Sequence, residues 1–577
     1  MVFFVSSRYA DLIKEMTTGG AVVNVLVGQC GNQVGTSFLA GLVDHLSDHA
    51  ASESATSMAR LQQTGVRDDQ EDASSHRYLD EAMQKYFVAP DDAVARYFAA
   101  NTATDPPADA PSCPLPLRPR AVLIDMEPKA MLQAAGDAFC RRDGGGRRAS
   151  PAWTLRMPLA TAVTRDSGSA NNWAFGYYRH GCSIAADITE AIRKEVEASE
   201  SLDGVHVVHG AAGGTGSGVG ALVADLVRES LAGGSRGALL HTMIWPFTGG
   251  ASARSDTTVG MMTPPRSVAS GEVVTQAFNT ILTLHVLNEQ ADAVHFLSND
   301  EAAAEAKYSE PTNIIRSELS RHSSGAGGGA ADSFASANQV LTRHLLALHL
   351  PRSERPFLAL PDPHRPHHPS VPPRPRTLPW AWQCWGGGTS LCRLIGDITG
   401  NDRDRKLFSS IVSPHDGVTT TEAKCDGHVA WASVHLPVLR VVHRLSVDIA
   451  AGCFLLRGLR AESEGADALE STFQQFVTDV APGSLCRSSP RLLWSTVAAS
   501  IPPCGRESSN RNGHLSTSAF LPTLAIGERV ARMAQQAEQL VHARAFVHHY
   551  ERYGVELDDL REAIYHAWVI AGAYGYD

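Results

Sequence analysis

The chain has 577 residues, with 50 Lys and Arg against 61 Asp and Glu, and therefore a formal net charge of −11. Hydrophobic residues make up 43% and charged residues 19%, a composition that supports a packed core and excludes a globally disordered chain. The excess of acid argues against a nucleic-acid partner held by bulk charge. At about 100–200 residues per domain, the length predicts two to four domains.

The ten cysteines are scattered and include no C-x-x-C pair, so neither a zinc knuckle nor a thioredoxin-like redox motif is expected. A chain this long does not need a disulfide framework, and a reducing, cytoplasmic compartment is favoured. The amino terminus lacks the basic segment and long apolar run of a signal peptide. No stretch reaches the roughly 18 uninterrupted apolar residues of a transmembrane helix. We therefore expect a soluble protein without membrane insertion.

Short apolar runs followed by loops predict buried parallel strands. These runs lie at 21–27, 121–124, 205–208 and 239–245. Apolar residues at helical spacing lie between them, at 184–198 and 220–231. Strand–loop–helix units in series predict an α/β fold with a parallel sheet and loops at the carboxyl ends of its strands. Further along, 446–456 predicts a buried strand, and 528–550 and 557–571 predict two long helices separated at Gly554.

Segments of different composition interrupt these units. They are 105–120, rich in Pro and Ala, 248–271, rich in Gly, Ser and Thr, 317–333, with a glycine run, and 351–379, with ten prolines. Such segments bury too little apolar surface to offset the entropy of ordering, so we expect exposed, largely disordered loops. His364, His367 and His368 lie in the last segment. A metal site there is conceivable, but a solvated loop is the simpler interpretation.

A glycine-rich loop, AAGGTGSG at 211–218, joins a predicted strand to a predicted helix. Glycines allow backbone N–H groups to approach an anion, and the following helix adds its positive amino-terminal end. The loop is not a Walker P-loop, because that motif requires a lysine. The segment 216–221 fits G-x-G-x-x-A of dinucleotide-binding folds, but the next strand ends at Trp245-Pro246 without the acid that holds the ribose. A tight turn without a ligand is the third interpretation.

Three further loops carry polar groups suited to a phosphorylated ligand. They are 28–33 (GQCGNQ) and 125–128 (DMEP), each after a predicted strand, and 168–173 (GSANNW). Each is a weak signal singly, since an Asp–Glu pair is usually solvated and Asn–Asn is common in turns. Together they place donors and carboxylates at the edge of the sheet where α/β folds bind ligands. Amides and glycine backbones suit phosphate oxygens, and carboxylates suit hydrated magnesium, so the four loops predict a magnesium–nucleotide site.

The motifs GQCGNQVG, VLIDMEP, SANNWAFGYYRHG and AGGTGSGVG occur in the order and spacing of the phosphate- and magnesium-contacting loops of the tubulin superfamily, which the sequence resembles. The delta type is the most similar, because of MEPK, NNWAFGYYRHG and Ala212 before the glycine pair. FNTILTLHVLNEQADAVHFLSNDEA and FASANQVLTRHL fit that type too. RAFVHHYERYGVELDD resembles a helix–turn near the end of the family's fold. The resemblance covers 21–350 well, apart from insertions, and 446–456 and 518–574 moderately.

The resemblance implies a tubulin-like α/β fold with a parallel-sheet GTP-binding domain, a smaller α/β second domain and C-terminal helices. The expected organisation is an N-terminal extension (1–20), a GTP-binding domain (21–350) with insertions at about 50–75, 105–120, 248–271 and 302–333, a Pro/His-rich insertion (351–384), a second domain (385–515) and C-terminal helices (516–577). On this view the length overestimates the number of domains, because insertions account for much of it.

Carried over position by position, the resemblance implies that Gln29, Asp125 and Glu127 hold magnesium, largely through water. The nucleotide-binding residues that it implies are Gly28, Gln29, Cys30, Asn171, Asn172, Gly213, Gly214, Thr215, Gly216, Ser217, Gly218, Asn279, Asn299, Phe334 and Asn338. The last four of these would recognise guanine and ribose, with an asparagine offering a donor and an acceptor and Phe334 stacking on the base. The alternatives are an ordinary core aromatic for Phe334 and a structural cap or turn for Asn279.

Hydrolysis in this family is completed by a loop of the neighbouring subunit, whose counterpart is best placed at 386–397 (GGGTSLCRLIGD). Cys392-Arg393 stands where an acid is expected, and Asp397 is the only nearby carboxylate, hence a candidate acting in trans. Activating water beside a phosphate requires a positioned acid or amide. We therefore expect GTP or GDP with magnesium as ligands, and GTPase activity that is weak, partner-dependent or absent.

The leading hypothesis is a GTP-binding structural protein of the cytoskeleton, acting in triplet microtubules at centrioles or basal bodies and so in cilium or flagellum assembly. Its expected partners are other tubulins, microtubules and centriolar or basal-body proteins. The chain closes at AYGYD without a run of glutamates, so the acidic surface of alpha- and beta-type tails is not expected. The alternatives are an active GTPase that co-polymerises with alpha- and beta-tubulin and, more remotely, a dinucleotide-binding oxidoreductase.

Overall fold

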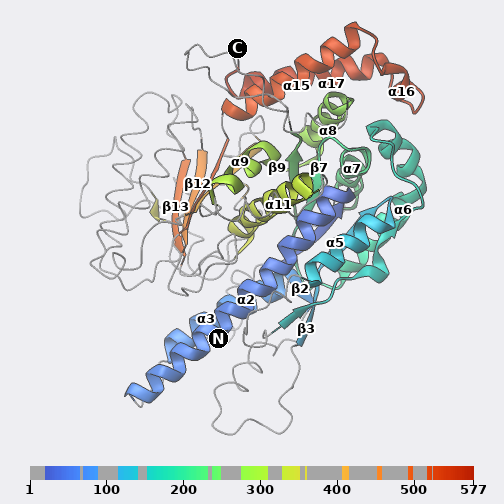
Figure 1. The fold of residues 1–577 in the computed structure, drawn as a ribbon. Coiled ribbons are helices and arrows are strands. Elements are labelled where there is room, and N and C mark those ends of the chain that lie inside the picture. Colours follow the sequence, from blue (N-terminus) through green and yellow to red (C-terminus); the bar gives the residue numbers. More distant parts are fainter. Residues whose placement is uncertain are drawn as a thin grey trace, which may run out of the picture.

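A computed structural model (Figure 1) describes residues 20–64, 69–88, 115–140, 153–231, 237–247, 274–309, 328–350, 406–414, 451–457, 491–497, 516–522 and 524–576, with 358–359 and Ile395. Residues 1–19 of the predicted N-terminal extension (1–20), the segment 248–271 and the histidines at 364–368 lie outside these residues.

Six parallel strands carry the predicted loops. In spatial order they are β6 (Val163–Thr164), β4 (Ala121–Asp125), β1 (Ala21–Val27), β7 (Leu202–Gly210), β8 (Ala238–Trp245) and β9 (Ala293–Ser298). The four strands predicted from apolar runs are β1, β4, β7 and β8, so the expected parallel α/β sheet is confirmed. Because all six run in one direction, their carboxyl ends share one edge of the sheet.

The same sheet continues beyond β9. β11 (Leu407–Pro414) runs parallel to β9 and antiparallel to β14 (Ser516–Leu521), and β14 pairs antiparallel with β12 (Ala451–Arg457). β13 (Arg491–Val497) and β10 (Leu358–Ala359) complete that side. β12 overlaps the strand predicted at 446–456. Most of 385–515 lies outside the described residues, so the expected second domain is represented mainly by these strands.

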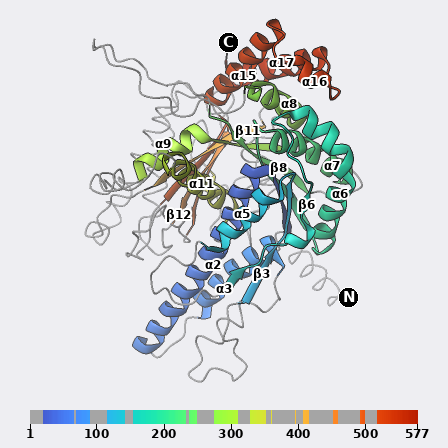
Figure 2. The same cartoon turned by 45° about the vertical axis from the view of Figure 1, so that its right-hand side comes forward.

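Helices cover both faces of the parallel strands (Figures 1 and 2). One face carries α2 (Gly28–Thr64), α3 (Asp69–Tyr86), α5 (Pro128–Cys140), α9 (Asn299–Ser309) and α11 (Gly328–His349). The other carries α6 (Gly181–Glu197), α7 (Gly220–Leu231), α8 (Gln276–Gln290), α15 (Leu524–His542) and α17 (Leu557–Ala573). β1 serves both cores by alternation, with Val22 and Leu26 facing the first and Val23 and Val25 the second.

A buried polar network lies between the sheet and α11. His206 of β7 contacts Asn24 Oδ1 through Nδ1 at 3.0 Å and Thr242 Oγ1 through Nε2 at 2.8 Å. Its ring lies on that of His349, the last residue of α11, with centroids 4.2 Å apart. All four residues are buried. Buried hydrogen bonds form only when their partners are aligned, so the contacts of His206 with Asn24 and Thr242 favour the observed register of β1, β7 and β8.

Two segments predicted as disordered loops contain regular structure. β3 (Leu115–Pro119) lies within 105–120, pairs with β2 (Phe87–Val88) and β5 (Trp153–Leu155), and buries Leu117 completely. Composition alone obscured the strand, although Leu115 and Leu117 already alternate as strand residues do. α11 begins at Gly328, inside 317–333, and the glycine run therefore enters a helix. Within the predicted insertion at 50–75, residues 50–64 continue α2 and 69–75 begin α3.

The prediction of one helix over 528–550 is wrong. α15 ends at His542, and α16 (Val547–Glu551) follows after Arg544 and Phe546, which have φ of 48° and 62°. Left-handed residues end a helix because they turn its backbone away from the helical path. α17 begins after Gly554 (φ 96°), as predicted, with a capping box formed by Glu556 and Asp559. Among the described helices, none is long and apolar enough to cross a membrane.

Candidate nucleotide-binding site

The structure brings the four predicted loops together at the carboxyl edge of the parallel strands. Asn32 in the first turn of α2 donates from Nδ2 to the carbonyl oxygen of Ile124 at the end of β4, at 3.0 Å. Ser169 of the 168–173 loop and Thr215 of the glycine-rich loop share a hydrogen bond of 2.9 Å between their hydroxyls. Gly168 lies against the carboxylate of Glu127. Loops from distant parts of the chain thus form one surface.

Close backbone packing explains two of the glycines. Gly28 has φ +71°, and a methyl group on it would lie 2.8 Å from the amide nitrogen of Gly216. A methyl group on Gly214 would lie 2.6 Å from both the amide nitrogen of Asn172 and the carbonyl oxygen of Ser169. Larger residues would therefore push the loops apart. Glycine here is required by close approach between loops as well as by backbone conformation.

Gly213 differs from these glycines because it faces open space. No heavy atom lies within 4 Å of a methyl group placed on it, and its backbone is extended, with φ −82° and ψ 160°. A π-helical turn (η4, Gly214–Val219) follows and runs directly into α7. The first N–H groups of this continuous helix have no intrahelical acceptors and carry the positive end of the dipole. The hydroxyl of Ser217 donates to the Gly213 carbonyl oxygen and fixes the turn.

The two carboxylates after β4 differ in environment. Asp125 is buried, its Oδ1 accepts a hydrogen bond from the Glu127 amide at 3.2 Å, and its Oδ2 has no hydrogen-bond partner. Burial raises the pKa of Asp125 to about 6, with the Glu127 charge adding to the rise. Glu127 and Gln29 are exposed. A buried carboxylate oxygen without a partner is costly, so a cation or its water shell at this position would lower the energy of the site.

Two predicted phosphate residues have different surroundings. Asn171 is exposed and has φ 51°, next to Ala170 with φ 48°. Asn172 is buried; its Nδ2 donates to the His549 carbonyl oxygen at 3.0 Å, and its Oδ1 accepts from the Phe175 amide at 3.1 Å. The side chain of Asn172 therefore ties the loop to the C-terminal region, which leaves Asn171 and the loop backbone to face a ligand.

Asn279, which was expected to contact the base or ribose, has all its side-chain polar atoms bonded within the protein. It is fully buried; Nδ2 donates to the carbonyl oxygens of Asn171 (2.9 Å) and Ala212 (2.6 Å), while Oδ1 accepts from the Trp173 amide (2.9 Å) and the Tyr550 hydroxyl (2.6 Å). Both donors and both lone pairs are thus in use. Asn279 instead holds two ligand loops and α16 together, which is the structural alternative.

Tyr550 is the partner that sequence reasoning missed. It is buried in α16, and its ring packs edge-on against Phe278 at 5.2 Å between centroids. Nothing in its local sequence indicates a role, because it lies 271 residues from Asn279. Burial raises the pKa of its hydroxyl above the usual range, so the hydroxyl remains a donor.

The remaining predicted residues are placed in part. Asn299 begins α9 directly after β9, at the carboxyl edge of the sheet, and is half-buried. Asn338 is half-buried on α11, with Nδ2 3.5 Å from Oε1 of Gln33 in α2. Phe334 lies on α11, but its side chain is outside the described structure, as is Asp397. Cys30 is half-buried, and burial raises the pKa of its thiol to about 12, so it is a neutral thiol and not a thiolate.

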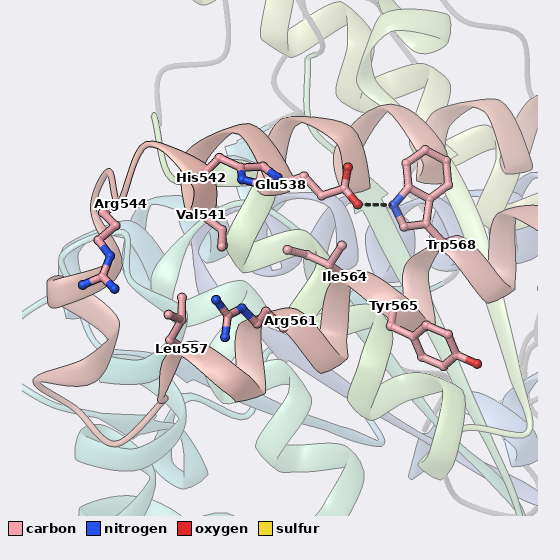
Figure 3. Close-up of a pocket in the computed structure, with 9 residues that line it drawn as sticks. All are labelled: Glu538, Val541, His542, Arg544, Leu557, Arg561, Ile564, Tyr565 and Trp568. Atoms are coloured by element: carbon pink, nitrogen blue, oxygen red, sulfur yellow. Dashed lines mark hydrogen bonds between the residues drawn. The ribbon is translucent and has the colours of Figure 1, made fainter.

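A pocket of about 430 Å³ lies elsewhere, between α15 and α17 (Figure 3). Its walls include Val541, Leu557 and Ile564, and the indole N–H of Trp568 donates to Glu538 at 2.9 Å. None of its lining residues belongs to the four loops. Cavity volume by itself would therefore indicate a different site from the four loops, which carry the backbone donors and the unpartnered carboxylate oxygen of Asp125.

Comparison with known proteins agrees with the family resemblance that the four loops indicate. Residues 21–306 match the family described as Tubulin/FtsZ family, GTPase domain. The human tubulin delta chain is 28% identical over 280 residues, which are 48% of this chain and 46% of that protein. The human tubulin beta-1 chain is 27% identical over 280 residues (48% and 45%), and the mouse tubulin delta chain is 33% identical over 181 residues (31% and 32%). The chain thus spans about half the length of these relatives, or less.

The matched region begins at β1 and ends in α9, so it contains all four loops and the parallel strands that carry them. The chain is a divergent member of the tubulin superfamily, and its residues 21–306 match the GTPase-domain model of that family.

Proposed function

We propose that the edge of the sheet formed by the four loops binds GTP or GDP with Mg²⁺. The single observation that carries the proposal is the meeting of the loops at this edge, where Ser169 bonds to Thr215 and Gly168 lies against Glu127, with Gly213 facing open space and Oδ2 of Asp125 without a hydrogen-bond partner. Phosphates would lie against the 213–218 backbone and Asn171. Gln29, Asp125 and Glu127 would hold magnesium, largely through water. When bound, Mg²⁺ neutralises charge on the phosphate oxygens.

Matched glycine substitutions test this proposal. Gly213→Ala places a methyl group in open space, so the fold should be retained while the path of the phosphates is obstructed. Gly136→Ala on α5 is the control, because its added methyl group also contacts nothing within 4 Å and lies outside the four loops. We expect GTP affinity of the purified full chain to fall at least about tenfold for Gly213→Ala only, equivalent to about 1.4 kcal/mol.

Binding of ATP and NAD⁺ should be measured beside that of GTP. Tight NAD⁺ binding without GTP binding would revive the dinucleotide alternative and defeat the proposal, as would a Gly213→Ala variant with wild-type GTP affinity. A second test uses Asp125→Asn, which retains the volume of the side chain but removes its charge. We expect this variant to lose most of the Mg²⁺ dependence of nucleotide binding.

At the cellular level we propose a structural role at centrioles or basal bodies, in the formation or maintenance of triplet microtubules and hence of cilia and flagella. The delta-type motifs and the similarity to tubulin delta chains support it. Other tubulins, microtubules and basal-body proteins would be the partners, and the cytoplasmic cytoskeleton the location. Imaging a tagged copy in a ciliated cell tests this, and uniform labelling along axonemal microtubules without a focus at their base would contradict it.

The second candidate function is a GTPase subunit that co-polymerises with alpha- and beta-tubulin. The 27% identity to a human tubulin beta-1 chain, almost equal to that with the delta chain, supports it. Single-turnover GTP hydrolysis with and without added alpha/beta dimer separates the two candidates. Turnover stimulated by the dimer and abolished by Asp397→Ala would favour the co-polymerising GTPase.

A further inference from the structure

A cluster of metal-ligand side chains lies between α8 and α17, away from the four loops. His285 on α8 and Glu562 and His566 on α17 each offer one ligand atom, and the three atoms lie within 4.8 Å of one another. α17 packs on α8 in both views of the fold (Figures 1 and 2). The cluster therefore joins the C-terminal helices to a helix of the GTPase domain.

The two imidazoles converge in a way that ordinary packing does not require. Their Nδ1 atoms are 2.6 Å apart, and the rings are stacked at 22° with centroids 4.6 Å apart. Without a metal, one Nδ1 must donate and the other accept, so the two rings cannot both be cationic. Two Nδ1 ligands on tetrahedral zinc would lie about 3.3 Å apart, given Zn–N bonds of about 2.0–2.1 Å. A separation of the rings by about 0.7 Å would thus admit the ion.

The third ligand, Glu562, lies beside His566 because of helical spacing. Glu562 precedes His566 by four residues, which places both on one face of α17, towards α8. Arg561, its neighbour, is already paired with Asp558 at 2.9 Å. Within the described structure Glu562 forms no ion pair, and it is exposed, while both histidines are half-buried. The cluster is therefore open to solvent on one side and covered on the other.

We propose that His285, Glu562 and His566 bind Zn²⁺ and fasten α17 to α8. Two nitrogens and one carboxylate oxygen suit a first-row transition ion, whereas magnesium and calcium prefer oxygen ligands alone. Three protein ligands leave a fourth position for water, on the exposed side. Burial and the neighbouring His566 lower the pKa of His285, while Glu289, Glu562 and Asp559 place negative charge around the cluster. The site shares no residue with the nucleotide loops.

The test uses the full chain, freed of metal with a chelator and kept in saturating Mg²⁺ and GTP so that the nucleotide site does not contribute. Zn²⁺ is titrated into the wild type, His566→Ala and Glu562→Gln. The control is His542→Ala, which removes an exposed histidine of the same C-terminal helices. We expect one zinc equivalent to bind the wild type and the control, and both ligand variants to bind it at least about tenfold more weakly, since even outer-shell substitutions cost 10–100-fold.

Two further measurements distinguish a zinc site from simple packing of the two histidines and from zinc bound by cysteine. Zinc should raise the thermal midpoint of the wild type and of His542→Ala but not of His566→Ala, and circular dichroism without metal checks that every variant is folded. Co²⁺ should give visible ligand-field bands without a thiolate charge-transfer band, because the ligands are nitrogen and oxygen. Equal zinc affinity in wild type and His566→Ala, or thiolate ligation alone, would overturn the proposal.

Discussion

The buried histidine His206 should make the stability of this protein depend on pH. It is fully buried in β7, and burial, with His209 nearby, lowers its pKa from 6.5 to about 3. The titratable side chains that interact with it are His209 of its own strand, His241 of β8, His295 of β9 and His349 of α11, and its other contacts include Asn24, Thr242 and Phe38. A neutral histidine is thus built into the core.

The direction in which stability changes with pH follows from the linkage between protonation and folding. Because the pKa is lower in the folded state, the unfolded chain takes up a proton first as pH falls below 6.5, so stability is complete above that pH and is lost as pH falls towards 3. Between pH 7 and pH 5, pKa values of 6.5 and about 3 predict a loss of about 2 kcal/mol from this one group. Against a typical total of about 5–15 kcal/mol, the effect is measurable.

The assay compares wild type with His206→Asn by urea unfolding at pH 7, 6 and 5 and constant ionic strength. The variant is less stable at every pH, because its amide cannot replace both hydrogen bonds. Its deficit should shrink by about 2 kcal/mol between pH 7 and pH 5, since it has no imidazole to protonate. Asp80 and Asp125, whose pKa values are raised to about 6, act with the opposite sign, but they are common to both proteins and cancel.

His548→Asn, which removes an exposed histidine from α16, is the matched control and should leave the pH dependence unchanged. If the free-energy difference between wild type and His206→Asn stays constant to within about 0.5 kcal/mol from pH 7 to pH 5, the reasoning is refuted, because one depressed histidine alone should change it by about 2 kcal/mol.

Three further predictions concern stability. Asn279→Ala removes four hydrogen bonds and should lower the free energy of unfolding by about 4 kcal/mol, whereas Tyr550→Phe should cost about 1–2 kcal/mol; similar losses in urea unfolding would contradict the central role of the amide. Asp203→Asn removes the carboxylate charge that lies 3.1 Å from the ammonium group of the buried Lys85 and should cost about 3–5 kcal/mol, and adding Lys85→Met should recover part of that in a double-mutant cycle. Ala170→Gly relieves a φ of 48° and should raise stability by about 0.5–1 kcal/mol in thermal unfolding; a lower midpoint would show that the loop is not strained there.

The sequence by itself determined the parallel sheet and the position of the ligand loops. Apolar runs of four to seven residues are too short for helices and are bounded by glycine, proline or an acidic residue, so β1, β4, β7 and β8 were predictable from local pattern. Glycine spacing likewise located the 213–218 loop, because close backbone approach restricts residue choice at particular positions. Composition was a poorer guide, since it obscured β3, whose strand pattern lies among prolines.

Only the tertiary structure decided what the individual side chains do. Asn279 and Asn171 look alike as sequence, but packing against Tyr550 and Trp173 uses every polar atom of the first and leaves the second exposed. The pairing of His285 with His566 joins residues 281 apart. Hydrogen bonds between distant segments depend on how the helices pack on the sheet, and the local periodicity of the sequence does not encode that packing. The packing of the helices on the sheet therefore decides which polar side chains are exposed at the loops and which form hydrogen bonds inside the protein.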